Sequence, residues 1–282
     1  MLKLCNIKKQ YPQFQLQCSL EVPKNCITAL IGPNGAGKST AFKAILGLIH
    51  IDGGEIELFG KPFCALTPQD RTRIGTALCN SGFSGYLKIR DIVPILSQMY
   101  PEFDKENFLE KCRHFDLSLD KKINDFSTGM KAKLKVLLAM SHNAQLLILD
   151  EPTVGLDVVA REEVLDMLRE YMLSGERSIL ISSHISSDLE GLCDDVYFIH
   201  EGQILLHEEI GTLLDCYGIL KVSGEQYNTM NQTRLIRKKK EIYGYSLLTS
   251  DKQFYLENMP ELTIEKCSID EVIIMMTKGE IL

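Results

Sequence analysis

The sequence predicts an α/β fold, with a mainly parallel sheet and an antiparallel flank. A glycine-rich segment at 32–37 stands between a strand-like apolar run and a helix-like one. A second apolar run, 146–149, ends in two acidic residues, which is typical of a buried parallel strand with a site at its carboxyl end. The first thirty residues read as strands, whereas strand and helix patterns alternate later in the chain.

Hydrophobic periodicity defines the individual elements. Alternating apolar residues predict strands at 2–8, 14–22, 26–31 and 55–59. Apolar residues three and four apart predict a helix at 39–48 and a mostly helical segment at 89–140. Further along, we expect a strand at 146–149, a helix at 161–173, a strand at 178–183, a helix at 187–193 and a hairpin of 196–200 with 203–207. The composition shifts near 216–218, which separates a domain at 1–217 from a small α+β accessory domain at 218–282.

The composition suits a folded protein of one or two domains. Of the 282 residues, 45% are hydrophobic and 24% are charged, which is ordinary globular usage. The 31 basic and 38 acidic residues give a net charge of −7, so we expect no nucleic-acid partner. The nine cysteines form no C-x-x-C pair and fit reduced thiols. We find neither a run of about 20 apolar residues nor a signal pattern, which favours a cytoplasmic protein.

A phosphate-binding loop is the most specific motif. Residues 32–40 read Gly-Pro-Asn-Gly-Ala-Gly-Lys-Ser-Thr and match G-x-x-x-x-G-K-[ST]. Gly35 and Gly37 allow positive φ, which turns backbone N–H groups toward a phosphate. Lys38 reaches the β- and γ-phosphates, and Ser39 offers its hydroxyl to Mg²⁺. The predicted nucleotide contacts are Gly32, Pro33, Asn34, Gly35, Ala36, Gly37, Lys38, Ser39 and Thr40.

Acidic residues supply the second half of the site. Asp150 and Glu151 follow the apolar run directly. We expect Asp150 to hold Mg²⁺ and Glu151 to act as the general base toward the attacking water. His184 follows the strand 178–183 and is a candidate for contact with the γ-phosphate, since a neutral imidazole can both donate and accept a hydrogen bond.

In this order, the motifs resemble those of the ATP-binding subunits of ABC transporters, over roughly residues 1–215. The segment 126–130, Phe-Ser-Thr-Gly-Met, resembles the family's signature, and 154–157, Val-Gly-Leu-Asp, resembles its D-loop. His184 matches the switch histidine, and Tyr11 is similar to the aromatic residue that stacks on adenine. The resemblance implies a P-loop ABC-type ATPase core with an antiparallel β subdomain and an inserted α-helical subdomain at about 80–142.

The resemblance also implies a head-to-tail dimer with two ATP molecules between the subunits. The second subunit would be an identical copy or a paralogue. Each ATP would lie between the phosphate loop of one copy and the signature of the other, where residues 131–141 predict a helix whose N-terminus suits a phosphate. The expected contacts from these segments are Ser127, Thr128, Gly129, Met130 and Asp157.

The sequence departs from the family pattern at three positions. Thr128 replaces a glycine and Met130 a glutamine of the signature. Cys79 stands where the family has its Q-loop glutamine, and a thiol cannot replace an amide toward a hard cation. Either Asn80 substitutes for the glutamine, or the contact is lost and the loop acts only as a hinge.

The resemblance narrows to bacterial stand-alone ATPases that serve a separate membrane permease and export peptides, antimicrobials or similar amphiphiles. The protein would then lie on the inner face of the cell membrane. The basic run from Arg234 to Lys240 predicts a solvated face, or a contact with anionic lipid or a partner. Alternative functions are an ABC ATPase that acts on ribosomes or DNA, an ATP-gated regulatory module with weak hydrolysis, and, more remotely, a small-molecule kinase.

Overall fold

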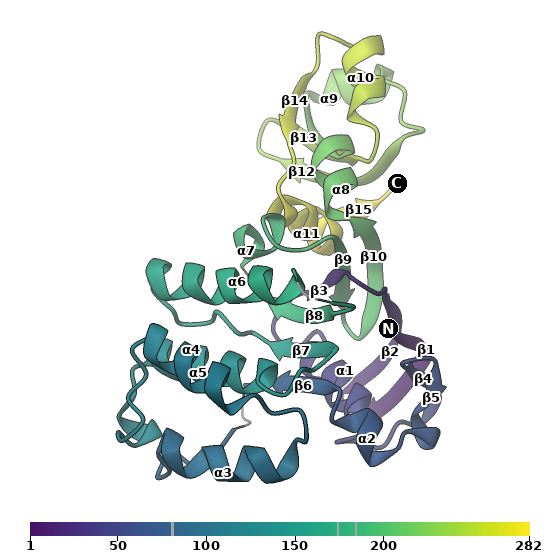
Figure 1. The fold of residues 1–282 in the computed structure, drawn as a ribbon. Coiled ribbons are helices and arrows are strands. Elements are labelled where there is room, and N and C mark those ends of the chain that lie inside the picture. Colours follow the sequence, from purple (N-terminus) through teal and green to yellow (C-terminus); the bar gives the residue numbers. More distant parts are fainter. Residues whose placement is uncertain (80–81, 174, 184) are drawn as a thin grey trace.

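The computed structural model describes residues 1–79, 82–173, 175–183 and 185–282. Its centre is a six-stranded sheet with the order β10-β9-β3-β8-β7-β6 (Figure 1). The strands are β3 (Ile27–Ile31), β6 (Ile74–Ala77), β7 (Leu146–Asp150), β8 (Ser178–Ser183), β9 (Asp195–His200) and β10 (Gln203–Glu209). Neighbouring strands run parallel except β10, which pairs antiparallel with β9. The α/β class predicted from the sequence is therefore confirmed.

An antiparallel sheet flanks the central one, as the alternating N-terminal residues predict. Its order is β2-β1-β4-β5. The strands are β1 (Leu2–Tyr11), β2 (Phe14–Val22), β4 (Gly53–Leu58) and β5 (Lys61–Pro62), followed by the short helices η1 (Phe63–Ala65) and α2 (Pro68–Arg71). This sheet shares a core with one face of the central sheet and with α1 (Lys38–Ile45).

Alternation along β7 shows how the central sheet builds two cores. Leu146 and Ile148 face the core that contains α1 and the antiparallel sheet. Leu147 and Leu149 face the second core, which contains α5 (Thr128–Met140) and α6 (Val158–Met172). Because strand side chains alternate between faces, a continuous apolar run is what a strand buried on both faces requires.

A helical segment lies beside the edge strand β6. It contains α3 (Ile89–Met99), α4 (Lys105–His114), η2 (Ile123–Asp125) and α5, and Figure 1 shows it at the end of the sheet marked by β6. Strand β6 was not expected from the sequence, because Ile74-Gly75-Thr76-Ala77 is short and contains a glycine. The glycine allows close packing: a Cβ on Gly75 would lie 2.0 Å from the backbone oxygen of Ala139 in α5.

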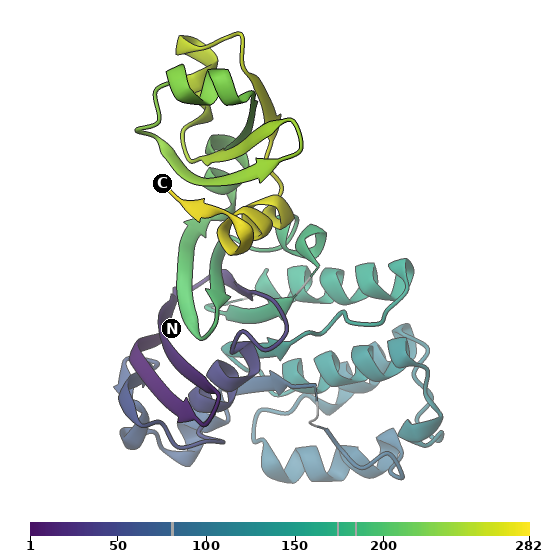
Figure 2. The same cartoon turned by 180° about the vertical axis from the view of Figure 1, so that it is seen from behind.

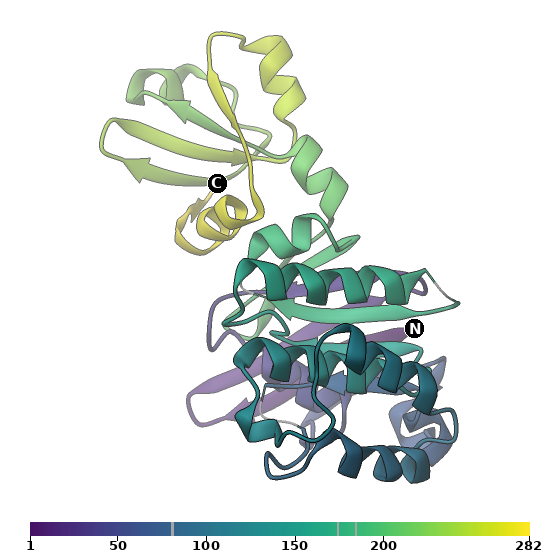
Figure 3. The ribbon, with the colours of Figure 1, turned by 60° about the vertical axis from the view of Figure 1, so that its left-hand side comes forward.

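Residues beyond 217 form a third, five-stranded antiparallel sheet with the order β14-β11-β13-β12-β15. It follows α7 (Ser186–Glu190) and α8 (Ile210–Cys216) and contains β11 (Gly218–Val222), α9 (Gly224–Thr229), β12 (Leu235–Glu241), β13 (Gly244–Thr249), α10 (Lys252–Asn258), β14 (Thr263–Lys266), α11 (Ile269–Lys278) and β15 (Glu280–Ile281). Figures 2 and 3 show this sheet at the end of the molecule opposite α3, with α11 between it and the central sheet.

Helix α11 belongs to the larger core rather than to the C-terminal sheet alone. Its side chains Ile269, Val272 and Met275 are at most 2% exposed, and they share a hydrophobic core with the helices of the central sheet. The residues beyond 217 also have a separate core, which includes Leu220, Leu247 and Tyr255, so the C-terminal part has one core of its own and shares the larger core through α11. Among the described helices, none has both the length and the apolar character that a bilayer span requires.

Candidate nucleotide-binding site

The glycine-rich loop connects β3 to α1 and leaves the start of that helix open. Gly35 and Gly37 have φ of 83° and 114°, in the left-handed region that favours glycine. A Cβ on Gly37 would lie 2.9 Å from Cζ of Phe14. Gly37 is also the N-cap of α1 and has no side chain to accept a hydrogen bond from the first amides. These amides are therefore available to an anion.

Lys38 is the first residue of α1 and is 6% exposed. Its Nζ donates to the backbone oxygens of Gly32 at 2.6 Å and Pro33 at 3.4 Å. It also lies 3.5 Å from Oε1 of Glu151. A buried ammonium needs such partners, and the carbonyls that hold it here belong to the loop itself. The charge therefore stays beside the open helix start.

Ser39 and Asp150 join the loop to the central sheet. Oγ of Ser39 donates to Oδ2 of Asp150 at 2.9 Å, and Oγ of Ser182 donates to Oδ1 at 2.7 Å. Asp150 ends β7, Ser182 is in β8, and the strands pair at this position. The carboxylate is only 6% exposed, so these two hydrogen bonds fix its orientation.

These oxygens fit a magnesium ion. Mg²⁺ prefers oxygen ligands and keeps several waters, with one or two protein groups and substrate phosphates as the remaining ligands. The Ser39 hydroxyl and the Asp150 carboxylate are such groups, and they already lie within hydrogen-bond distance of each other. Among the described residues, no group of three or more histidine, cysteine, aspartate or glutamate side chains could form an all-protein metal site.

Glu151 turns sharply away from the end of β7. Its φ is 54°, a left-handed conformation that costs about 1–3 kcal/mol in a residue other than glycine. The backbone N–H of Glu151 donates to Oγ of Ser182 at 3.0 Å and to the Ser182 backbone oxygen at 3.2 Å. Through this turn the carboxylate reaches Lys38. The two acids after β7 thus have different neighbours, Ser39 for Asp150 and Lys38 for Glu151.

Tyr11 lies at the end of β1, beside the phosphate loop. Its ring centroid is 6.3 Å from that of Phe14 across the β1–β2 turn, and Phe14 packs closely on Gly37. The Tyr11 side chain is 36% exposed, and the ammonium of Lys9 lies 5.8 Å from the ring centroid. An exposed ring near the loop is accessible to a nucleotide base.

The signature segment stands at the start of α5. Ser127 is the N-cap and accepts a hydrogen bond from the amide of Met130 at 3.2 Å. The helix begins at Thr128, three residues before the start predicted at 131, because Ser127 satisfies the first turn. Thr128 therefore takes a helical conformation in place of the family's glycine, and the first turn carries no acidic residue that would repel a phosphate. Gly129 packs against α6, with 3.1 Å from an added Cβ to Cβ of Ala160.

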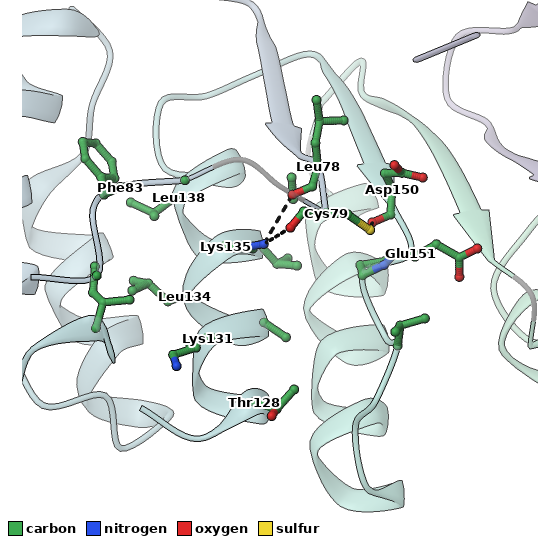
Figure 4. A pocket seen from close by; sticks show the side chains of 18 of the residues that line it. Leu78, Cys79, Phe83, Thr128, Lys131, Leu134, Lys135, Leu138, Asp150 and Glu151 are labelled. Atoms are coloured by element: carbon green, nitrogen blue, oxygen red, sulfur yellow. Dashed lines mark hydrogen bonds between the residues drawn. The ribbon is translucent and has the colours of Figure 1, made fainter. Parts of the chain in front are cut away.

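Cys79 lines a cavity of about 450 Å³ together with Thr128, Lys135 and Glu151 (Figure 4). Its Sγ donates to the backbone oxygen of Asp150 at 3.5 Å. Nζ of Lys135, from α5, donates to the backbone oxygens of Cys79 at 2.9 Å and Leu78 at 3.3 Å. Partial burial and, after it, the nearby carboxylates of Asp150 and Glu151 raise the pKa of the Cys79 thiol. The thiol thus stays protonated at neutral pH and serves as a hydrogen-bond donor rather than as a metal ligand.

Among the remaining predicted contacts, Asp157 lies at the start of α6. Oδ1 of Asp157 caps α6 by accepting from the amide of Ala160 at 2.9 Å, so this carboxylate has a structural role in the free subunit. His184 and Asn80 lie outside the described residues. The other predicted contacts in the loop follow its course: Pro33 and Asn34 are exposed, Gly32 and Ala36 are buried, and Thr40 is half-buried in α1.

Ser182 is the site residue that the sequence analysis missed. It donates to the Asp150 carboxylate and accepts from the Glu151 amide, so a single hydroxyl orients both acids. A usable signal was present, because Ser182 and Ser183 are polar residues at the carboxyl end of an otherwise apolar strand. That edge of a parallel sheet is where ligand sites form.

The comparisons with known proteins agree with this geometry. A protein-family model described as "ABC transporter" matches residues 16–154. The chain is 34% identical to the lantibiotic transport ATP-binding protein SrtF of Streptococcus pyogenes, over 74% of this chain and 91% of that protein. It is 36% identical to the bacitracin transport ATP-binding protein BcrA of Bacillus licheniformis, over 68% of this chain and 63% of that protein. A solved dimeric ATP-binding cassette in a post-hydrolysis state, bound to ADP and Pi, shares the fold with a TM-score of 0.65 and 19% identity, over 74% of this chain and 99% of that one.

We predict that Ser182→Ala weakens binding of Mg-ATP about three- to tenfold, because the Asp150 carboxylate loses one of its two orienting hydrogen bonds. The measurement is titration with a fluorescent ATP analogue in the presence of Mg²⁺. Ser178→Ala is the matched control. Ser178 is also buried in β8, and its Oγ donates to the backbone oxygen of Pro23 at the other end of the strand. Both variants should lose about 1 kcal/mol of stability, and equal affinities in the two would refute the role of Ser182.

Proposed function

The chain belongs to the ABC transporter family of ATP-binding proteins, and from this premise we propose that it is the ATP-hydrolysing subunit of an export system whose membrane permease is a separate chain. The observation that supports the proposal most directly is the convergence of Lys38, Ser39, Asp150 and Glu151 at one edge of the central sheet. The relatives named above act in lantibiotic and bacitracin transport. Peptides and similar amphiphiles are therefore the class of cargo that we propose.

Each residue of the site has a proposed part in hydrolysis. The open amides of α1 and the ammonium of Lys38 would bind the phosphates. Ser39 and Asp150 would hold Mg²⁺, which when bound neutralises charge that develops on the transferred phosphoryl group. Lys38 now contacts loop carbonyls and Glu151. A phosphate would replace these contacts and leave Glu151 to accept the proton of the attacking water.

We further propose that two subunits bind ATP head to tail between them. Support comes from α5, whose exposed start at Ser127 and Thr128 carries the positive end of a helix dipole, with no acidic residue in the first turn of the helix. It also comes from Val158 and Val159 at the start of α6, which are 80% and 70% exposed. Large apolar side chains at such exposure favour an interface with a partner. The dimeric cassette with ADP and Pi has the same fold.

The groove between the helical segment and the central sheet is the proposed permease site. Two cavities lie there, of about 450 Å³ and 190 Å³, and share Phe83, Lys135 and Leu138. The smaller one is lined in part by Met99 and Tyr100 at the end of α3, and Met99 is 57% exposed. An apolar groove of this kind fits a helical segment of a partner. Because it also borders Cys79 and Glu151, a bound permease would contact the walls of the ATP site.

We predict that Glu151→Gln lowers the ATP hydrolysis rate at least 100-fold, the usual contribution of a positioned general base. ATP binding should persist, because the amide removes the proton acceptor and a negative charge but leaves Lys38 in place. The hydrolysis rate is measured from the release of inorganic phosphate. Dimerisation in the presence of ATP is measured by light scattering. Glu162→Gln, on the exposed surface of α6, is the control and should behave as wild type. A Glu151→Gln variant that hydrolyses ATP at the wild-type rate would rule out this residue as the base.

We predict that Met99→Asp abolishes co-purification of a multi-span membrane protein from detergent-solubilised membranes. A carboxylate in the groove would be buried without a partner by any docked segment. The matched control is Leu256→Asp in α10, because Leu256 is 47% exposed and lies at the opposite end of the molecule. The hydrolysis rate of the isolated subunit should be unchanged in both variants. Equal recovery of the membrane protein with the two variants would place the permease site elsewhere.

Contact with anionic lipid is a separate proposal, and the structure limits the residues that can make it. Arg234, Lys238 and Lys239 pair with Asp251, Glu280 and Glu241 respectively, which reduces their attraction to lipid. The turn after Lys240 presents Ile242 and Tyr243, which are 88% and 94% exposed. Figure 1 places this C-terminal sheet at the end of the molecule opposite α3. A permease bound along α3 would hold the turn away from the bilayer, so lipid contact is expected only for the free subunit.

The corresponding prediction concerns vesicles of phosphatidylcholine with phosphatidylglycerol. The free subunit should sediment weakly with them at low salt and lose binding in about 0.3 M salt, because each exposed cation contributes only about 1 kcal/mol. Substitution of Ile242 and Tyr243 by serine should remove the binding. If the subunit does not sediment with the vesicles at low salt, the proposed lipid contact is wrong and the basic run is a solvated face.

A further inference from the structure

Helix α7 is held between the ATP site and the C-terminal sheet. It has five residues, Ser186–Glu190, and connects β8 to the segment before β9. In the chain, two residues separate it from the end of β8, the strand that contains Ser182. Figure 3 shows α7 between α6 and α11.

One side of α7 is bonded to the loop that follows Glu151. Asp188, in the middle of the helix, is 1% exposed. Its Oδ2 accepts a hydrogen bond from Oγ1 of Thr153 at 2.7 Å, and its Oδ1 pairs with the guanidinium of Arg161 in the first turns of α6. Thr153 is 2% exposed and lies two residues after Glu151. A buried carboxylate with two partners fixes the loop on one side of the site.

The other side of α7 is bonded to α11. Oγ of Ser186 donates to Oδ2 of Asp270 at 2.7 Å, and the amide of Ile269 donates to Oε1 of Glu190 at 3.4 Å. Asp270 has a well-defined place, because a capping box of Ser268 and Glu271 holds the first turn of α11. Both ends of α7 therefore contact the same turn of α11.

Apolar side chains also pack α7 and the residues after it against α11. Leu189 is 1% exposed and Cys193 7% exposed, and both share a core with Ile269 and Val272 of α11, which are 0% and 2% exposed. A shift of α11 would displace α7, because close-packed side chains leave no space for independent motion. Asp188 would then move relative to Thr153.

We propose that α11 is a positioning element for ATP hydrolysis, and that Asp270 acts through Ser186 and α7 to hold the loop 152–157 that follows the catalytic glutamate. The C-terminal domain thereby sets the hydrolysis rate of its own subunit. The proposal rests on the hydrolysis mechanism assigned to Glu151 above. Asp270 does not contact substrate. It acts by accepting the hydrogen bond from Ser186, which holds α7 in place, and the hydrogen bond from Thr153 to Asp188 of α7 then holds the loop beside Glu151.

The test compares Ser186→Ala and Asp270→Ala, which remove the same hydrogen bond from its two sides. In each, the kcat for ATP hydrolysis should fall about three- to tenfold, the rate equivalent of one well-placed hydrogen bond. The KM for ATP should stay within about twofold of the wild-type value, because the phosphate loop is unchanged. The double variant should match the single variants, since only one bond is lost.

A second readout separates positioning from loss of stability. Hydrogen–deuterium exchange of the peptide 152–161 should accelerate in Ser186→Ala and Asp270→Ala but not in Glu280→Ala. Glu280 is the matched control, because it is an acid of the same domain that stands in β15 and pairs with Lys238 of β12. If Asp270→Ala does not fold, Ser186→Ala still tests the bond from the other side. A kcat within twofold of wild type in the folded variants, or an effect that multiplies in the double variant, overturns the proposal. Wild-type protein without ATPase activity would refute the proposed function instead.

Discussion

The hydrogen bond between Ser39 and Asp150 is the contact on which the rest of the site depends. It joins the start of α1 to the end of β7, two positions that are 111 residues apart in the sequence. Only the parallel order β3-β8-β7 brings the glycine-rich loop and the acidic strand end to the same edge of a sheet. The other groups of the site lie around this contact. Ser182 donates a hydrogen bond that orients the Asp150 carboxylate, and the ammonium of Lys38 pairs with the Glu151 carboxylate.

The residues around this contact lower the stability of the free subunit, and neighbouring groups offset part of this effect. A lysine at 6% exposure and a glutamate with φ of 54° are unfavourable features in a fold without a ligand. Loop carbonyls and the Lys38–Glu151 pair offset part of the cost in the free subunit. These are also the contacts that an incoming phosphate can replace. Binding of a nucleotide phosphate would therefore relieve these unfavourable features and, at the same time, change the neighbours of Glu151.

The sequence was sufficient to predict the parts of the fold and site that depend on local patterns. The glycine-rich loop, the apolar run before Asp150 and the hairpin of β9 and β10 all have short-range signals, and the structure has each of them. Strand β6 escaped prediction because its stability comes from pairing with β7 and from the contact of Gly75 with α5, neither of which is local. Ser182 was missed although it is polar at a strand end, since its importance lies in two partners that are distant in the sequence, the Asp150 carboxylate and the Glu151 amide. The role of His184 stays a prediction, because this residue lies outside the described ones.

The C-terminal residues show that two parts of a chain with different sheets can still be packed together through a shared core. The shift near 216–218 marks the start of a new sheet, and strands β11 to β15 pair only with one another among the described strands. Yet Ile269, Val272 and Met275 of α11 are buried with side chains of the central sheet. A domain that shares part of its buried apolar surface with another cannot move as a rigid body without exposing that surface, at a cost of about 25 cal/mol for each Å². The C-terminal sheet is therefore mechanically part of the ATPase, and α7 stands at the point where the two are joined.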